Sequence, residues 1–510
     1  MAARLGRRGF LRDFGGGAAV LTAATLLPGA ARATSAMGFE DARHLLSRTA
    51  LGATPADILT TQTLDYTAAV DRLLARFRRQ AATPAPAWVS EGPSFLRQQA
   101  RAQAEKEGVE AKPLKIVQKR VQEEGRELRN WWVEEMITTD QPLVERMTLF
   151  WHNHFTSSIQ KVRFVPSMYW QNVLFRREAF GNFATLLHAV ARDPAMLIYL
   201  DGVRSVARQP NENFGRELLE LFTLGEGHYT EADIKNAARA FTGWSIDRET
   251  GHFQNHAQQH DDGEKTFLGQ TGRFNGEDIV NILLRQPRTA ETIVEKLWRE
   301  FVSLKPEPAE VKRLAAIFRT SGYEMKPLLR ALFLSPAFRD PANRAALIKS
   351  PIELIVGSVR VLGLPVPDKT QLVRMMGALG QIPFNPPNVK GWPGGESWIT
   401  TNTLLLREQF LRRIIEATTV SPMGGGQMMA GDMAGAQGRR AERREQLPVE
   451  GRSLRNSAGE AHLGPTLAGV DTDTLRRTLL PRVPIDGVDA GDAPGAVVAA
   501  ALLDPAYQLK

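Results

Sequence analysis

The chain has 510 residues, of which 43% are hydrophobic and 24% are charged, and it contains no cysteine. This composition is ordinary for a folded protein and excludes a disordered chain, a collagen-like fibre and a disulfide framework as descriptions of the whole. The absence of thiols also excludes a cysteine nucleophile, a cysteine-ligated zinc or iron–sulfur centre and a lipidated cysteine. Any metal ion would therefore need histidine, carboxylate or carbonyl ligands.

The first 33 residues have the pattern of an export signal. Basic residues precede a mildly apolar run at 18–27, and small residues flank the expected cleavage point after Ala33. The segment Arg7–Arg12 resembles the twin-arginine export motif. The alternative, a membrane anchor, needs roughly 20 apolar residues, and Pro28 closes the run too early. We therefore expect a twin-arginine-type signal peptide at 1–33, no transmembrane segment after its cleavage, and a mature protein in the periplasm or outside the cell.

The leader also accounts for half of the net charge. It carries five Arg and one Asp, so its removal lowers the formal net charge from +8 to +4. Residues 437–455 hold six Arg and three Glu and so contribute three of the four charges that remain. Since the rest of the chain is nearly neutral, we expect no nucleic-acid partner.

Helical periodicity of apolar residues runs through most of the mature chain, which predicts a mostly α fold. We expect a single large multi-helix body over residues 34–420. Residues 421–459 are rich in Gly, Met and Arg and are predicted to form a disordered insertion. Residues 460–510 are predicted to be a C-terminal helical segment that completes the core.

Local signals place several of the expected helices. Pro142 is a favourable first-turn residue for one helix, and a second strong helix is expected at 213–224. Thr230 and Asp233 predict a capping box at the start of the next helix. Between 244 and 269 the periodicity is lost, so this stretch is predicted to be a long polar loop with room for one short hairpin. Later helices are expected at 277–284, 291–301, 309–320, 326–334 and 351–362.

An acidic helix face is the first candidate for chemistry. Asn213, Glu217 and Glu220 stand at i, i+4 and i+7 and so share one face of the helix. Two carboxylates beside apolar side chains would have raised pKa values, which suits general acid or base catalysis, or they would bind a hard cation. The alternative is an exposed acidic stripe paired with Arg216 or Lys235.

Two histidine-bearing loci are further candidates. His152 and His154 point about 200° apart on a regular helix, so both can bind one metal ion only if the helix ends near His152. The alternative that we favour is that one of them works in the site while the other is a satisfied core residue. His260 and Asp261 lie on the polar loop and are candidate ligands for a divalent metal ion.

A turn-rich loop at 385–395 contains three prolines and Trp392, and Trp398 follows it. Trp392 and Trp398 are candidate ligand-binding residues, together with Asn213, because an aromatic ring beside a rigid loop can form a platform for a sugar or an apolar ligand. The alternative is that both rings fill the core. The chain has no glycine-rich phosphate loop, no serine nucleophile elbow and no His-Glu-x-x-His motif.

Several motifs occur in an order that resembles the bacterial domain-of-unknown-function 1800 family. They are Arg43-His44-Leu45-Leu46 with Gly52-Ala53-Thr54-Pro55, Phe150-Trp151-His152-Asn153-His154-Phe155, Asn211-Glu212-Asn213 with residues 216–225, residues 229–233, Thr242-Gly243-Trp244, residues 260–269 and residues 386–393. The resemblance covers residue 38 to the C-terminus. It implies a mostly helical exported protein, often encoded beside a twin-arginine-exported member of the domain-of-unknown-function 1501 family, and it supplies no established reaction.

Two functional hypotheses follow. The first is a hydrolase-like enzyme that acts on a cell-envelope or extracellular substrate, with Glu217 as acid or base and the histidines as ligands or proton carriers. The second is a non-enzymatic scaffold or partner for a domain-of-unknown-function 1501 protein, in which the same motifs hold helices together. Convergence of the motifs in one open pocket favours the enzyme, whereas burial with full mutual hydrogen bonding favours the scaffold.

Overall fold

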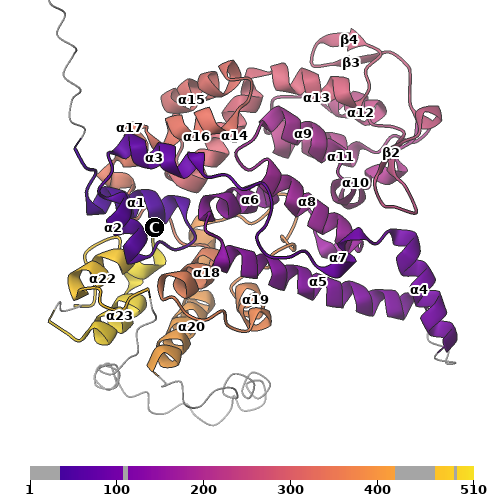
Figure 1. Ribbon diagram of the computed structural model, residues 1–510. Helices are drawn as coiled ribbons and strands as arrows, with labels where there is room; N and C mark the ends of the chain where they lie inside the picture. Colours follow the sequence, from indigo (N-terminus) through magenta and orange to yellow (C-terminus); the bar gives the residue numbers. More distant parts are fainter. Residues whose placement is uncertain (1–34, 107–112, 420–465, 488–490) are drawn as a thin grey trace, which may run out of the picture. The chain divides into compact units, whose positions relative to one another are not determined.

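The computed structural model describes residues 35–106, 113–419, 466–487 and 491–510. Within these residues the regular structure is helical apart from two small antiparallel hairpins, which confirms the prediction of a mostly α fold (Figure 1). The predicted signal peptide at 1–33 and the predicted insertion at 421–459 lie outside the described residues. The described residues from Ala36 onward belong to one compact unit.

Local sequence signals set the ends of many helices in the first part of this unit. Proline stands in the first turn of the helix that begins at Pro142, as predicted, where its missing N–H costs no hydrogen bond. The helices of this part are α1 (Phe39–Thr49), α2 (Pro55–Thr61), α3 (Tyr66–Ala75), η1 (Ala87–Ser90), α4 (Pro93–Lys106), α5 (Pro113–Thr138), α6 (Pro142–His154), α7 (Ile159–Val162), α8 (Val165–Arg177), α9 (Phe183–Ala191), α10 (Pro194–Tyr199) and η2 (Gly202–Arg204).

The predicted helix at 213–224 has an irregular second half. Its first part, α11 (Glu212–Glu217), continues into a π-helical stretch, η3 (Leu218–Thr223). Such stretches are uncommon and recur at functional sites. The next helix, α12 (Glu231–Ala240), begins with the predicted capping box, in which Thr230 and Asp233 exchange hydrogen bonds with each other's backbone N–H groups.

The polar stretch after α12 forms two hairpins, where the sequence left room for one. Strand β1 (Trp244–Ile246) pairs with β2 (Phe253–Asn255), and β3 (Lys265–Phe267) pairs with β4 (Gln270–Gly272), with η4 (Ala257–Gln259) between them. Asp233 helps to hold the second turn, because its carboxylate accepts a hydrogen bond from the Leu268 N–H at 2.7 Å. This long-range contact has no signature in the strand sequence.

Helices resume for the rest of the described chain. The elements are α13 (Gly276–Arg285), α14 (Pro287–Phe301), α15 (Pro308–Thr320), α16 (Met325–Phe333), α17 (Pro336–Arg339), η5 (Pro341–Asn343), α18 (Pro351–Val361), α19 (Lys369–Ala378), η6 (Gly395–Trp398), α20 (Thr401–Thr419), α22 (Thr472–Leu479), α23 (Pro494–Leu503) and η9 (Pro505–Gln508). Figure 1 shows α22 and α23 beside α1 and α2, so the first and last described helices are neighbours.

Helix α6 is buried on nearly every side, although it carries adjacent charged residues. A helix that is buried all round needs a partner for each charge, because an unpaired buried ion is costly. Glu145 accepts a bidentate pair of hydrogen bonds from Arg176 of α8 at 2.6 and 2.8 Å, and both side chains are 1% exposed. Arg146 pairs with Glu353 of α18. The charges of α6 therefore tie it to two neighbouring helices.

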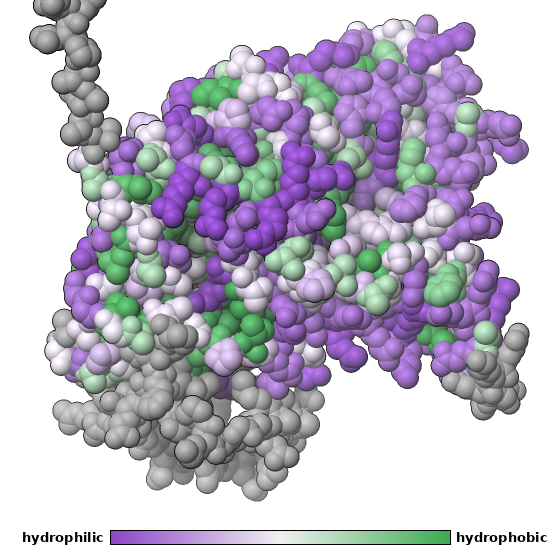
Figure 2. All heavy atoms as spheres, viewed as in Figure 1, coloured by the Kyte–Doolittle hydropathy of each residue, from purple (hydrophilic) through white to green (hydrophobic). Residues whose placement is uncertain are grey.

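The outer surface is mostly hydrophilic on the face shown in Figure 2, with small separate groups of apolar side chains. Among the described residues, no helix has the length and apolar character needed to span a bilayer.

Candidate functional site

A cavity of about 350 Å³, which we call the main cavity, lies beside the C-terminal end of α6. Its volume lies in the range of small-molecule sites, about 300–1,000 Å³. Its walls come from α6, α14, the segment 347–353 and the loop 390–398. The charged lining residues are Arg146, Lys296, Arg299, Glu300, Glu353, Lys390 and Lys510, and the rings that line it belong to Phe150, His154, Trp392 and Trp398.

The lining holds five cationic side chains and two carboxylates. Arg146, which is 2% exposed, donates hydrogen bonds to Glu353 and, at 2.8 Å, to Glu300. Lys510 also donates to Glu353. Burial alone would raise the pKa of Glu353, but the charges of Arg146 and Lys510 outweigh burial and hold that pKa well below its usual range. Both lining carboxylates are thus already paired with cations.

Lys296 is a cation of the main cavity without a carboxylate partner among the described residues. Its Nζ atom lies 3.0 Å from His154 Nδ1 and donates a hydrogen bond to the Leu221 carbonyl oxygen at 2.6 Å. Burial, and to a smaller degree the charge of Arg299, lowers the pKa of Lys296 to about 8. Lys296 therefore remains mostly protonated at pH 7 but releases its proton more easily than an ordinary lysine.

The position of Lys296 follows from how α14 packs against η3. Arg288, Thr292 and Lys296 stand at i, i+4 and i+8 on α14, and all three donate hydrogen bonds to carbonyl oxygens of η3 and the residue after it. The acceptors are the carbonyls of Leu221 and Leu224. Carbonyls at a helix end lack partners within the helix and attract cationic donors. The same contact that completes the π-helical stretch therefore orients the ammonium group beside the cavity.

The two histidines of α6 are separated as the helical geometry predicts, because α6 continues to His154. His152 is 1% exposed, and its Nε2 atom accepts a hydrogen bond from the Phe384 N–H at 3.2 Å. Its ring centroid lies 5.4 Å from that of Trp132 and 5.7 Å from that of Trp392. Burial lowers the pKa of His152 to about 3, so it is a neutral core residue with its proton on Nδ1.

His154 has different surroundings from His152. It lines the main cavity, and its Nδ1 atom accepts the hydrogen bond from Lys296. Burial and the charge of Lys296 lower the pKa of His154 well below the usual value. A neutral imidazole beside a protonated amine can orient that amine or exchange a proton with it.

The predicted acidic face lies next to this cavity rather than in its lining. Glu217 is 9% exposed and accepts no hydrogen bond from a described residue. Burial, followed by the charge of Glu220, raises the pKa of Glu217. Glu220 accepts a hydrogen bond from the Tyr229 hydroxyl at 2.9 Å and lies 3.7 Å from Nζ of Lys390. Lys390 also lines the main cavity, so Glu220 lies within one side chain of the cavity wall.

Asn213, the third residue predicted on this face, contributes to the start of α11. Its N–H donates to the Asn211 side chain at 2.8 Å, and its Nδ2 atom donates to the Leu200 carbonyl at 3.3 Å. It does not line the main cavity.

The tryptophan loop packs directly on the end of α6. Asn153 accepts a hydrogen bond from the Trp392 N–H at 2.7 Å and lies against Gly391, which has a φ of 80°. A Cβ atom at Gly391 would stand 2.3 Å from the Asn153 Oδ1 atom, so only glycine allows this approach. Trp392 and Trp398 are 4% and 7% exposed, and both also line the cavity. Both rings are therefore buried in the core and also form part of the cavity wall.

The second histidine locus lies on the loop after β2 and has its own partners. The Nδ1 atom of His260 lies 3.0 Å from the Thr242 carbonyl oxygen. Asp261 accepts hydrogen bonds from two nitrogens of Arg239 at 2.7 and 3.2 Å, and these bonds lower its pKa. Neither His260 nor Asp261 lines the main cavity. In the described part of the chain, no group of three or more His, Asp or Glu side chains is placed to hold a metal ion.

The structure therefore brings together His154, Trp392 and Trp398, and places Glu217 and Glu220 beside them. It adds cations that the sequence analysis did not identify. The sequence does indicate that Arg146 is buried, because it follows Leu143 by three residues and precedes Phe150 by four, on the apolar face of the helix. A charge on such a face must have a buried partner. Lys296 and Lys510 have no comparable signal, because distant segments bring them to the cavity.

Replacement of Glu217 by Gln is expected to leave stability unchanged or to increase it by up to about 1 kcal/mol. The reason is that this buried carboxylate accepts no hydrogen bond and repels Glu220. The pKa of Glu217 is raised in the folded state, so ionisation of Glu217 lowers the free energy of unfolding as pH rises through the normal carboxyl range. The glutamine side chain does not ionise, so the variant lacks this loss of stability. Thermal melts at pH 4 and pH 7 measure this, with Glu212→Gln on the same helix as control. A loss of about 2–4 kcal/mol would show instead a structural role.

Comparison with known proteins identifies a family, but finds no significant match among the curated proteins or the solved structures. The family model described as "Protein of unknown function (DUF1800)" matches residues 44–509. The match begins within α1 and ends just after η9, so it includes the helices that form the main cavity and the motif residues from His44 to Pro393. The chain belongs to the DUF1800 family of proteins of unknown function.

Proposed function

We propose that this protein is an exported hydrolase-type enzyme that binds an organic anion in the main cavity and uses Lys296 for proton transfer. The observation that carries this proposal is a partly buried ammonium group at the cavity, bonded to His154 and without a carboxylate partner in the described chain. The hydrolase hypothesis from the sequence is thus kept, with Lys296 in the role first given to Glu217.

The distribution of charge supports an anionic ligand. Lys296 has no carboxylate partner among the described residues. Arg299 lies 3.8 Å from Glu295 and Lys390 pairs with Glu226 at 3.1 Å, and neither of these carboxylates lines the cavity. The lining itself therefore holds more cations than carboxylates. Arg299 and Lys390 are 48% and 62% exposed, which places them where they can attract an approaching anion from solvent. Lys296 lies deeper, where low dielectric strengthens its interaction with a bound negative group.

The aromatic wall supports a ligand with a ring or an apolar face. Trp392 and Trp398 give the cavity flat surfaces next to its cations. Pockets that combine apolar walls with a few placed polar groups are typical of small-molecule sites. A saccharide of the cell envelope or its surroundings that carries a carboxylate or phosphate group has both required features.

The chemistry available at Lys296 is proton transfer. An amine with a pKa of about 8 is a general acid at neutral pH, able to protonate the oxygen that leaves when water cleaves an ester or glycosidic bond. His154 accepts a hydrogen bond from the ammonium group and fixes its direction. Arg146 and Lys510 are held by Glu353, so they shape the wall rather than supply protons.

Binding is tested by thermal denaturation with a panel of galacturonate, glucose 1-phosphate and benzoate, with glucose as the neutral control. We expect at least one anion to stabilise the protein, by about 2.7 kcal/mol at a concentration 100 times its Kd. Lys296→Met should abolish this stabilisation, whereas Lys312→Met on the exposed side of α15 should not. Equal responses to glucose and to the anions would contradict the proposed ligand class.

Turnover is tested by product release from anionic saccharides and phosphate esters. Lys296→Arg is expected to keep ligand binding but to lower kcat about 10²–10⁴-fold, because a guanidinium does not release its proton. In the unaltered protein the rate should fall as pH rises above about 8, since the acid form of Lys296 is then lost. A rate that Lys296→Arg leaves unchanged would remove Lys296 from the mechanism.

Export by the twin-arginine route remains part of the proposal, supported by the segment Arg7–Arg12 and the small residues before Thr34. We expect the intact mass of the exported protein to correspond to an N-terminus near Thr34. Replacement of Arg7 and Arg8 by Lys should block export. A mature protein that retains Met1 in the cytoplasm would contradict this.

A non-enzymatic partner role beside a domain-of-unknown-function 1501 protein is the second candidate. One observation favours it: His152 and Asp261, two of the motif residues, have hydrogen bonds that serve the fold. Co-expression of the two proteins followed by size-exclusion chromatography tests for a stable complex. A complex together with no turnover on any anionic substrate would favour this role over the enzyme.

A further inference from the structure

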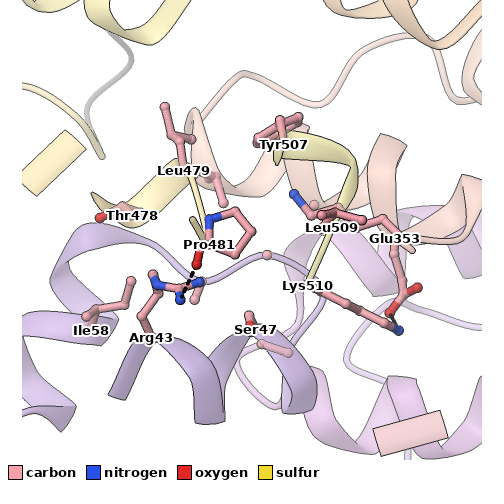
Figure 3. Close-up of a pocket in the computed structure, with 16 residues that line it drawn as sticks. Arg43, Ser47, Ile58, Glu353, Thr478, Leu479, Pro481, Tyr507, Leu509 and Lys510 are labelled. Carbon is pink, nitrogen blue, oxygen red and sulfur yellow. Dashed lines mark hydrogen bonds and ion pairs between the residues drawn. The ribbon is translucent and has the colours of Figure 1, made fainter. Parts of the chain in front are cut away.

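A second cavity, of about 60 Å³, lies between the first and last described helices, and we call it the small cavity. Figure 3 shows Arg43 of α1 on one side and Lys510 with Glu353 on the other, while Ser47 lies at the base. Glu353 and Lys510 line both cavities. Arg43 and Lys349 line the small cavity and not the main one.

The small cavity has more positive charge than its carboxylate can balance. Arg43, Lys349 and Lys510 line it together with one carboxylate, Glu353, which is already paired with Lys510 and Arg146. Arg43 has its carboxylate partner outside the lining, Glu40 at 3.3 Å, and donates to the Pro481 carbonyl oxygen at 3.2 Å. Arg43 is 4% exposed. Buried charges of one sign are costly unless an opposite charge is close. An anion in the cavity would supply that charge.

Lys349 is the group with the least compensation. Its Nζ atom lies 3.6 Å from the ring centroid of Tyr507 and makes no hydrogen bond or ion pair with any residue in the described ranges. Burial lowers the pKa of Lys349 to about 7, since nearby cations largely cancel the help from Glu353. The charged and titratable groups around it are Glu353, Arg43, Arg407, Lys510 and Tyr507.

The Thr478 hydroxyl completes a donor set suited to an oxyanion. The Oγ1 atom of Thr478 is buried and has no hydrogen-bond partner in the described part of the chain. An unsatisfied buried hydroxyl costs about 1–3 kcal/mol unless something bonds to it. Ser47, at the base of the cavity (Figure 3), already donates its hydroxyl hydrogen to the His44 carbonyl oxygen at 2.9 Å, so Thr478 is the hydroxyl that remains for an anion.

The dimensions restrict the ligand to a small ion. One water needs about 10–15 Å³ of such a cavity, so 60 Å³ holds a few waters or one tetrahedral oxyanion. Gly52, with a φ of 88°, keeps the space narrow, because its Cα faces α18 so closely that a Cβ would stand 2.6 Å from the Gly357 carbonyl oxygen. An organic anion of the size expected for the main cavity does not fit here.

We infer that the small cavity is a binding site for an inorganic oxyanion, phosphate or sulfate, contacted by Lys349, Arg43 and the Thr478 hydroxyl. The inference does not depend on the proposed enzyme function, because Arg43, Lys349 and Thr478 do not line the main cavity. It assigns a ligand to Lys349 and to the Thr478 hydroxyl, whose side-chain polar atoms have no hydrogen-bond partner among the described residues.

Isothermal titration calorimetry of the full mature chain with sodium phosphate, and separately with sodium sulfate, tests the inference. We expect one equivalent of anion to bind, and Lys349→Met to weaken binding at least about tenfold, which is about 1.4 kcal/mol. Lys349→Arg should retain most of the affinity, because it keeps the charge. Lys390→Met, which alters only the main cavity, is the matched control and should leave the Kd unchanged.

The outcomes separate the two cavities. Loss of binding in Lys349→Met and in the second variant, Arg43→Gln, but not in Lys390→Met, supports the small-cavity site. Binding of sulfate, whose charge is the same at both pH values, should also be weaker at pH 9 than at pH 6, as Lys349 loses its proton. No binding of either anion at 10 mM, or binding that only Lys390→Met removes, would overturn the inference. Neither result decides the proposed function of the main cavity, which is tested separately by the response of the Lys296 variants to organic anions.

Discussion

Replacement of Glu353 by Gln is expected to lower the free energy of unfolding by about 3–5 kcal/mol. Glu353 is 8% exposed and pairs with both Arg146 and Lys510. A neutral amide would leave these two buried cations without their shared counter-charge. The cost of an uncompensated buried ion is far larger than the net value of the pair itself. Urea denaturation at pH 7 measures the change.

Glu300→Gln is the matched control for this substitution. Glu300 pairs with the same Arg146, but its side chain is 34% exposed, so its removal should cost no more than about 1 kcal/mol. The pH dependence gives a second check. Because the pKa of Glu353 is depressed in the folded state, its stabilising contribution is present above the normal carboxyl pKa and is lost as pH falls. The Glu353→Gln protein should lack this part of the acid sensitivity, and equal costs for the two variants would contradict the network.

Replacement of Gly391 by Ala should be far more damaging than the same change at Gly394. Both glycines have positive φ, 80° and 72°, so an alanine at either position carries a backbone strain of about 1 kcal/mol. At Gly394 nothing lies within 4 Å of the new Cβ, so the loss of stability should be limited to this backbone strain. At Gly391 the Cβ also meets Asn153, so we expect a total loss of about 3 kcal/mol.

The effect of Gly391→Ala should extend to ligand binding. Displacement of this loop breaks the hydrogen bond from Trp392 N–H to Asn153 and moves the aromatic wall of the main cavity. Thermal melts with and without the best anion of the panel measure stability and binding in one experiment. If Gly391→Ala and Gly394→Ala behave alike, the close approach to Asn153 does not control the loop.

Much of the fold was predictable because the residues that set where a helix begins act locally. The proline at the start of α6 and the exchange between Thr230 and Asp233 act within one turn, so sequence alone identifies them. The interruption in η3 was not predictable in the same way. Its carbonyls are satisfied by Lys296 and other side chains of α14, about 70 positions further along the chain, and no local pattern encodes that contact.

The candidate site was only partly predictable for a related reason. His154 and the tryptophans were identified because their residue types suggest chemistry wherever they occur. The cations of the main cavity are ordinary lysines and arginines in sequence, and what makes them special is burial beside one another. Arg146 pairs with a residue 207 positions away, and such a separation gives no signal in a single sequence. The histidine pair was partly resolved by geometry, since a continuous helix must place His152 and His154 apart.

The position of Lys510 in both cavity walls has a consequence for synthesis. Lys510 contacts Glu353, 157 positions earlier, and Arg43 contacts the backbone of Pro481, 438 positions later. Contacts between segments so far apart form late, because the chain between them must first be ordered. A nascent chain therefore cannot complete either cavity until residues 505–510 have left the ribosome and docked. Until then the walls of both cavities lack Lys510 and the ion pair that it forms with Glu353.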